Sequence, residues 1–287
     1  MMLASSRKIL SYLLSAITAV VLVVAVISGI NHLTIGNKNF YIKSFSTQAL
    51  ADECDKQLTE KYKTLSSKSN LPFDIFDSVK VKFDTKESLN QAAEFLFDEN
   101  DATLKNGSRY NYFKSTIGEY IEANDIKISD KTIDIVASEA QQVYSDTVGI
   151  HNLEFLQNDM QKQNTRSIHS FSICIAILAF AAFLLSYIYD KKVQFVLYFS
   201  SGIMAGGVAT VLSSLVMRLT HVGTVTVSPA VWSSAFGNMA NNILLFRIIA
   251  GIVVWLIGTA LFVFAQHRIN REQMRKNTRY SKIFAKL

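Results

Sequence analysis

The sequence contains few residues that break helices, form disulfides or carry charge. Its 287 residues include 2 Pro, 2 Cys and 12 Gly, and only 18% are charged, against roughly 25% in soluble domains. These low counts exclude a collagen-like chain, a disulfide framework and a highly charged disordered chain. Apolar residues make up 49% of the chain and gather in blocks near both ends. This uneven distribution indicates a membrane protein.

Four apolar segments reach the ~20 residues that a helix needs to cross a ~30 Å hydrocarbon core. They are residues 9–30, 167–189, 193–217 and 243–265, and none contains Asp, Glu or Lys. The sequence therefore predicts an all-α polytopic protein with four transmembrane helices. The apolar run of the first segment exceeds the roughly 7–15 residues of a cleaved signal peptide, which favours an uncleaved signal anchor.

Basic residues cluster beside the membrane on one predicted side. Residues 1–8, the hairpin 190–192 and the tail 266–287 together carry a charge of +9, whereas residues 31–166 carry −5. Because basic flanks are retained in the cytoplasm, we expect both termini to be cytoplasmic. Residues 31–166 then form an extracytoplasmic domain between the first two spans, and residues 218–242 form an outer loop. Few cysteines and many Lys and Asn residues point to a bacterial plasma membrane. The basic charge is thus a topology signal, and no nucleic-acid partner is expected.

The predicted extracytoplasmic domain has helical periodicity. Apolar stripes predict helices at about 41–67, from Asp84 onward, at about 110–121, and from Ser129 or Asp130 onward. Residues 72–83 alternate in polarity and predict a short extended piece. Cys54 falls on the stripe of the first of these helices, which favours a buried thiol over an intermolecular disulfide.

This arrangement resembles, in layout only, the ligand-binding domains of bacterial chemoreceptors and sensor kinases. The resemblance covers residues 9–189 and rests on no sequence motif. The cytoplasmic pieces are too short to fold into an output domain, so a signal would have to pass to a partner inside the bilayer.

Small residues in the last two spans predict close helix packing. Gly202 and Gly206 form a G-x-x-x-G with Gly207 beside it, and Gly251 and Gly258 lie seven residues apart in the next span. Small residues let helix backbones approach each other in lipid. The contact is either internal or made with another subunit.

The predicted outer loop is unusually apolar. Ser228 and Pro229 match a helix N-cap followed by proline at the first helical position, and Trp232 and Phe236 would share one face of a short helix. Either this helix lies in the membrane interface, or it re-enters the membrane and closes a cavity between spans.

Ionisable residues near the outer boundary suggest two kinds of site. His32, His169 and His221 lie beside different spans and are candidate metal ligands, although no metal-binding spacing links them. Arg218 and Arg247 lie at the same level and either extend toward water or form a positive collar for an anionic group.

No catalytic motif is present. The sequence lacks G-x-S-x-G, C-x-x-C and a P-loop, and no span supplies a carboxylate. We therefore expect a protein without enzymatic activity or cofactor. It would present a helical binding or sensing domain, and its spans would dock with another membrane protein or with a second copy. The alternative is a small transporter or channel, or an accessory subunit of one.

Overall fold

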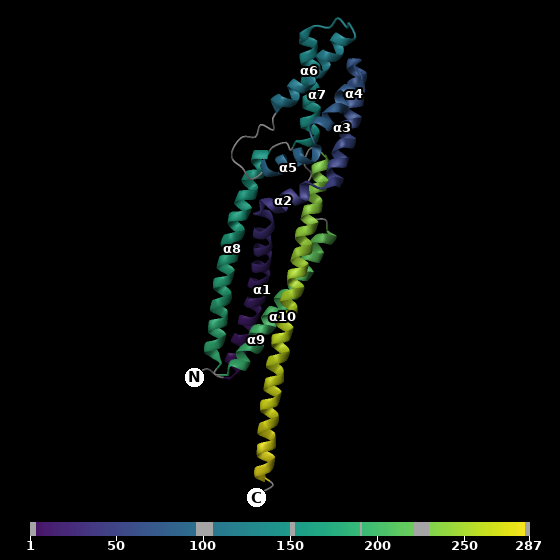
Figure 1. Ribbon diagram of the computed structural model, residues 1–287. Coiled ribbons are helices and arrows are strands. Elements are labelled where there is room, and N and C mark those ends of the chain that lie inside the picture. Colours follow the sequence, from purple (N-terminus) through teal and green to yellow (C-terminus); the bar gives the residue numbers. More distant parts are fainter. Residues whose placement is uncertain (1–3, 96–105, 150–152, 190, 221–229, 285–287) are drawn as a thin grey trace. The chain divides into compact units, whose positions relative to one another are not determined.

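The computed structural model describes the chain except for residues 1–3, 96–105, 150–152, 190, 221–229 and 285–287. All regular structure among the described residues is α-helical (Figure 1). The chain divides into two compact units. The first unit comprises Met1–Leu33, Gln163–Val222 and Asn241–Leu287, and the second comprises Thr34–Lys162 and Gly223–Ala240.

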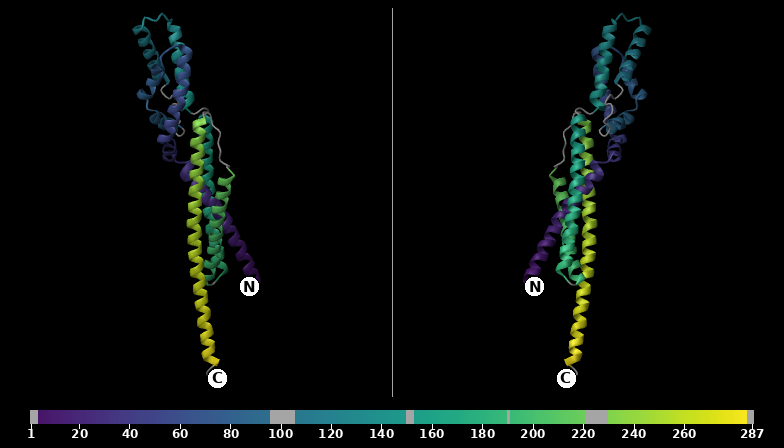
Figure 2. Two further views of the ribbon diagram at one scale, coloured as in Figure 1. Left: turned by 90° about the vertical axis from the view of Figure 1, so that its right-hand side faces the viewer. Right: turned by 90° about the vertical axis from the view of Figure 1, so that its left-hand side faces the viewer.

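Most of the first unit comes from four long helices. They are α1 (Ala4–Ile35), α8 (Leu153–Ile188), α9 (Lys192–Leu219) and α10 (Ala230–Phe284), and each is long and apolar enough to cross a membrane. The last residues of α1 and the first turns of α8 and α10 belong to the second unit. Each predicted span lies inside one of these helices, except that Tyr189 follows the last residue of α8. The prediction of four membrane-spanning helices is thus confirmed at the level of helix length and composition. Figure 2 shows the C-terminal part of α10 extending past the end of the α8–α9 pair.

Shorter helices build the second unit. They are α2 (Lys38–Phe45), α3 (Gln48–Ser69), α4 (Phe73–Lys82), α5 (Thr85–Phe95), α6 (Asn106–Ala123) and α7 (Asp130–Val148). Helix α7 packs against both α3 and α6, and α5 packs against α2 and α3 (Figure 1). The residues that cap α7 and α5 lie at the helix starts predicted from the sequence. The Ser129 side chain accepts from the backbone N–H of Thr132, and Asp84 accepts from that of Lys86.

One predicted helix is divided in two. Residues 41–67 were expected to be continuous, but α2 ends at Phe45 and α3 begins at Gln48. The Thr47 side chain accepts from the backbone N–H of Leu50, which gives α3 an N-cap of its own. Threonine and serine favour such local bonds over helix continuation, which explains the break at this point.

The prediction of a short extended segment at residues 72–83 is wrong. Helix α4 occupies Phe73–Lys82 and buries Ile75, Phe76 and Val79, whereas Val81 is 92% exposed. An isolated extended segment would leave its backbone groups without a ladder partner, whereas a helix satisfies them internally.

The core of the second unit is dense in aromatic and small residues. Tyr62 of α3 stacks on Phe76 of α4 and meets Phe113 of α6 edge-on, each with ring centroids 6.0 Å apart. Ala137 and Ala140 of α7 are fully buried, and the Tyr62 hydroxyl donates to the Ala140 carbonyl oxygen over 3.3 Å. The bond between Tyr62 and Ala140 joins α3 to α7, and a groove lies between these two helices.

Candidate functional site

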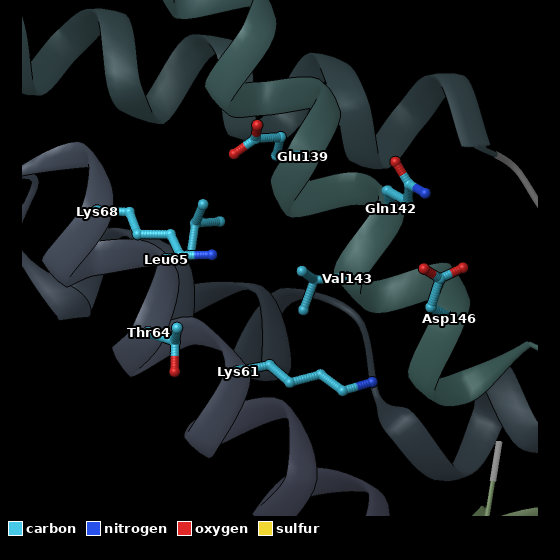
Figure 3. Close-up of a pocket in the computed structure, with 8 residues that line it drawn as sticks. All are labelled: Lys61, Thr64, Leu65, Lys68, Glu139, Gln142, Val143 and Asp146. Carbon is cyan, nitrogen blue, oxygen red and sulfur yellow. The ribbon is translucent and has the colours of Figure 1, made fainter.

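A groove of about 390 Å³ lies between α3 and α7 in the second unit (Figure 3). Its volume falls within the roughly 300–1,000 Å³ of small-molecule sites. Eight of the described residues line it, four from each helix: Lys61, Thr64, Leu65 and Lys68 from α3, and Glu139, Gln142, Val143 and Asp146 from α7. Each set follows the i, i+3, i+4, i+7 spacing of a single helix face, so both walls are regular.

The two walls carry opposite charge. The ammonium groups of Lys61 and Lys68 come from α3, and the carboxylates of Glu139 and Asp146 come from α7 (Figure 3). Lys61 reaches across to α7, where its Nζ donates to Thr147 Oγ1 over 2.9 Å. The groove can therefore receive a cationic and an anionic group of one ligand at the same time.

Leu65 and Val143 give the groove an apolar floor. Leu65 is 5% exposed, and Val143 is half-buried. The Tyr62 hydroxyl donates to the α7 backbone, and burial raises the pKa of Tyr62. That hydroxyl therefore stays neutral and structural. Ligand contacts would come from the charged walls and the apolar floor.

A second polar cluster lies inside the same unit. Arg109 of α6 is 4% exposed, and its guanidinium carbon lies 4.6 Å from the Tyr144 ring centroid and 5.3 Å from that of Phe83. Arg109 and Tyr144 both donate to Ser88 Oγ over 3.0 Å. These aromatic faces and the hydroxyl stabilise the buried cation.

Sequence reasoning missed both the groove and Arg109. The spacing of Lys61, Leu65 and Lys68 marks a helix face, but the facing residues of α7 can be recognised only when the two helices are paired. Similarly, the partners of Arg109 come from α5, α7 and the residue after α4, and nothing in the sequence around residue 109 marks it as buried.

The glycines of α9 face two different helices. A Cβ atom at Gly202 would lie 2.7 Å from the Ser15 carbonyl oxygen of α1, and one at Gly206 would lie 2.9 Å from that of Ala19. On another side of α9, a Cβ at Gly207 would lie 2.5 Å from the Trp255 backbone nitrogen of α10. Helix α9 is therefore in close backbone contact with both α1 and α10.

The glycines of α10 complete the second of these contacts. A Cβ at Gly251 would lie 3.1 Å from the Gly207 carbonyl oxygen, and one at Gly258 would lie 2.6 Å from the Met204 backbone nitrogen. Of the two alternatives drawn from sequence, the structure places these glycines in internal contacts of the first unit.

The candidate metal ligands are not brought together by the described structure. His32 Nδ1 lies 2.8 Å from Asn164 Oδ1, and His169 Nδ1 lies 2.8 Å from the Thr165 carbonyl oxygen of its own helix. His221 falls outside the described residues. Within the described part of the chain, no group of three His, Cys, Asp or Glu side chains is placed to hold a metal ion.

The two arginines of the predicted collar have different surroundings. Arg247 is half-buried, and its Nη2 donates to Asn31 Oδ1 of α1 over 2.5 Å, while Nη1 lies 3.8 Å from Met217 Sδ of α9. Arg218 is exposed at the end of α9. Arg247 therefore links three helices of the first unit through a neutral amide and a thioether.

Trp232 and Phe236 lie in the first turns of α10, which differs from the short separate helix expected in residues 218–242. Trp232 is fully buried in the second unit, with its ring 5.0 Å from Phe45, and its Nε1 donates to the Val148 carbonyl oxygen over 3.2 Å. Phe236 also lies 5.0 Å from Phe45. Pro229 falls outside the described residues.

Comparison with protein-family models, with curated proteins and with solved structures gave no match to this chain.

Proposed function

We propose that the chain is a non-catalytic membrane protein whose second unit lies outside the cytoplasm and binds a ligand in the α3–α7 groove. The observation that carries the proposal is the pairing of two lysines on one wall with two carboxylates on the other, above an apolar floor. The four long apolar helices support its placement in a membrane. The basic flanks of the spans support the outer position of residues 31–166. The few cysteines and the many Lys and Asn residues support a bacterial plasma membrane.

The groove favours a small zwitterionic ligand. A ligand with an ammonium and a carboxylate can pair with both walls, whereas an ion of one sign would meet like charge on one of them. The apolar floor adds room for a hydrocarbon side chain. Free amino acids and short peptides have this chemistry and fit the volume of about 390 Å³.

Thermal unfolding of the purified full chain tests the groove. Amino acids and short peptides are added, and a bound ligand raises the unfolding temperature because it binds only the folded state. In the variant Lys68→Gln/Glu139→Gln the net charge is unchanged but one charge is lost from each wall. Both side chains are exposed, so the fold should be retained.

Lys56→Gln/Glu122→Gln is the matched control, because both residues are exposed and neither lines the groove. We expect stabilisation of the wild type and the control, and about tenfold weaker binding by the groove variant. The proposal would be rejected if no compound stabilised the protein, or if the control lost binding equally.

The proposal includes docking with a partner or a second copy inside the membrane. Because the glycines are engaged within the first unit, docking would use outward apolar side chains such as Phe180 and Phe183 of α8, which are 60% and 65% exposed. Cross-linking in native membranes tests this part, and a solitary monomer there would contradict it.

No observation favours the transporter or channel alternative. In that alternative the third and fourth predicted spans and the Trp232 segment would line a path. In the described residues α9 and α10 touch backbone to backbone at Gly207 and Gly258, and Trp232 is buried in the second unit.

A further inference from the structure

A separate pocket of about 430 Å³ lies in the first unit, near the start of α1 and the turn between α8 and α9. The described residues that line it come from α1, the end of α8, the residues on either side of position 190, the start of α9 and α10. All four long helices thus border one cavity at one end of the apolar spans.

The charged residues that the structure describes in the pocket lining are all basic. They are Arg7, Lys8 and Lys191, and no carboxylate is among the described residues that line the pocket. Glu272 of α10 pairs with Lys191 at 3.0 Å, which offsets one of the three cations. The remaining excess of positive charge favours an anionic group.

Aromatic side chains hold the wall in place. The Tyr189 and Tyr198 rings are stacked with centroids 5.4 Å apart, and Tyr12 meets Tyr198 edge-on at 5.4 Å. The Ser11 hydroxyl lies 2.8 Å from the Tyr189 hydroxyl, which joins α1 to the end of α8. The pocket is therefore formed by several interlocked helices, unlike a row of separate surface lysines.

The other lining residues identify the class of ligand. Ile188, Leu197 and Ile269 give the pocket apolar surface, and they adjoin the ends of predicted spans. A free phosphate ion would leave this surface unused, whereas a phospholipid places its phosphate and its hydrocarbon chains at adjoining depths. Basic pockets between transmembrane helices suit the headgroups of anionic lipids.

We propose that this pocket binds the headgroup of an anionic phospholipid, with the phosphate near Arg7, Lys8 and Lys191 and the acyl chains along the apolar side chains. The proposal is independent of the α3–α7 groove. A lipid held here would contact all four spanning helices and stabilise their association.

Binding to the purified full chain in detergent tests the proposal. Phosphatidylglycerol, phosphatidylcholine and inorganic phosphate are titrated separately, and binding is followed by native mass spectrometry and by the unfolding temperature. We expect phosphatidylglycerol to bind at least about tenfold more tightly than phosphatidylcholine. Inorganic phosphate should change the unfolding temperature little.

Two variants and a matched control locate the site. Arg7→Gln/Lys8→Gln removes two cations from the pocket, and Arg271→Gln/Arg275→Gln removes two exposed cations from outside it. Gln194→Trp fills the pocket without changing charge. We expect the pocket pair and Gln194→Trp to lose the preference for phosphatidylglycerol, and the tail pair to retain it.

Three results would overturn the proposal. Equal losses in the pocket and tail pairs would show non-specific attraction, and unchanged binding by Gln194→Trp would place the lipid elsewhere. Equal stabilisation by inorganic phosphate would show a free-anion site. The unfolding temperature of each variant without added lipid shows whether it is folded, so a folding defect is separated from a loss of binding.

Discussion

Trp232 does not have the surroundings of a tryptophan in a helix at the membrane interface. Its ring is fully buried among protein side chains, and its Nε1 donates to the Val148 carbonyl oxygen. Trp232→Ala should destabilise the second unit by about 3–5 kcal/mol, through lost burial and the cavity left behind. Thermal unfolding of the full chain, with hydrogen exchange at peptides covering α2 and α7, measures the effect.

Trp232→Phe is the matched control. It keeps an aromatic ring near Phe45 but removes the donor to Val148, so we expect a smaller loss of about 1–2 kcal/mol. Exchange rates in α2 and α7 unchanged by Trp232→Ala would contradict the anchoring role.

Cys54 provides a prediction about pH. Burial, with smaller contributions from Asp55 and Glu53, raises the pKa of the Cys54 thiol from 9.0 to about 12. At pH 8 the thiolate population is therefore roughly a thousandfold below that of an unshifted thiol. In a Cys174→Ser background, maleimide should label the folded protein very slowly and the unfolded protein rapidly.

The same shift sets the direction of the stability change. Between pH 9 and about 12 the unfolded thiol loses its proton while the folded one retains it, so the stability of the second unit should fall as pH rises through this range. Cys54→Ala should reduce this slope. Rapid labelling of the folded protein at pH 8 would contradict the burial.

At the residue scale, the sequence predicts burial and capping that depend on nearby residues of the same helix. It does not predict burial that depends on residues of other helices. The burial of Cys54 follows from its spacing with Leu50 and Leu58, and the cap at Ser129 follows from residue type. The burial of Arg109 depends on Tyr144 and Ser88, which lie on other helices. The pattern of apolar residues along α6 therefore does not show that Arg109 is buried.

At the scale of elements, the contact of α9 with α10 depends on the absence of side chains. A Cβ at Gly207 would lie 2.5 Å from the Trp255 nitrogen and 2.8 Å from the Gly251 carbonyl oxygen. Because both are backbone atoms, they can move only if the helices separate. Gly207→Ala should therefore cost about 1–3 kcal/mol, measured as a lower unfolding temperature in detergent.

Gly237→Ala is the control for this prediction. Gly237 also lies in a helix, α10, but a Cβ there meets nothing within 4 Å. Alanine should be neutral or stabilise the helix by up to about 1 kcal/mol. Equal stability of Gly207→Ala and the wild type would show that the helices do not approach as closely as described.

Elements differ in how far their sequences determine them. The long apolar helices follow directly from composition, since the hydrocarbon thickness sets their length. The division of α2 from α3 and the helical form of α4 were not predicted, because short amphipathic segments fit more than one period. The groove cannot be predicted from either helix alone. It forms where the lysine face of α3 meets the carboxylate face of α7, so its prediction requires the pairing of the two helices.

At the scale of the whole molecule, charge and apolar surface are divided along the chain in a consistent way. Basic residues adjoin the ends of the long apolar helices, and the acidic excess lies in the segment that forms most of the second unit. Lys and Arg concentrated beside membrane spans are what the positive-inside rule associates with the cytoplasmic side. The two proposed ligands match this division, a zwitterion for the mixed groove and an anionic lipid for the basic pocket.

Sidedness can be tested directly with single cysteines. In a background of Cys54→Ala and Cys174→Ser, Val81→Cys and Met274→Cys place thiols at side chains that are 92% and 62% exposed. Because the basic tail should be retained in the cytoplasm, a membrane-impermeant maleimide should label position 81 in intact cells and position 274 only after permeabilisation. The exposure of both sites means that an unlabelled thiol reports the membrane barrier and not burial. If position 274 were labelled in intact cells and position 81 were not, the topology would be the opposite of the predicted one. The groove would then lie in the cytoplasm.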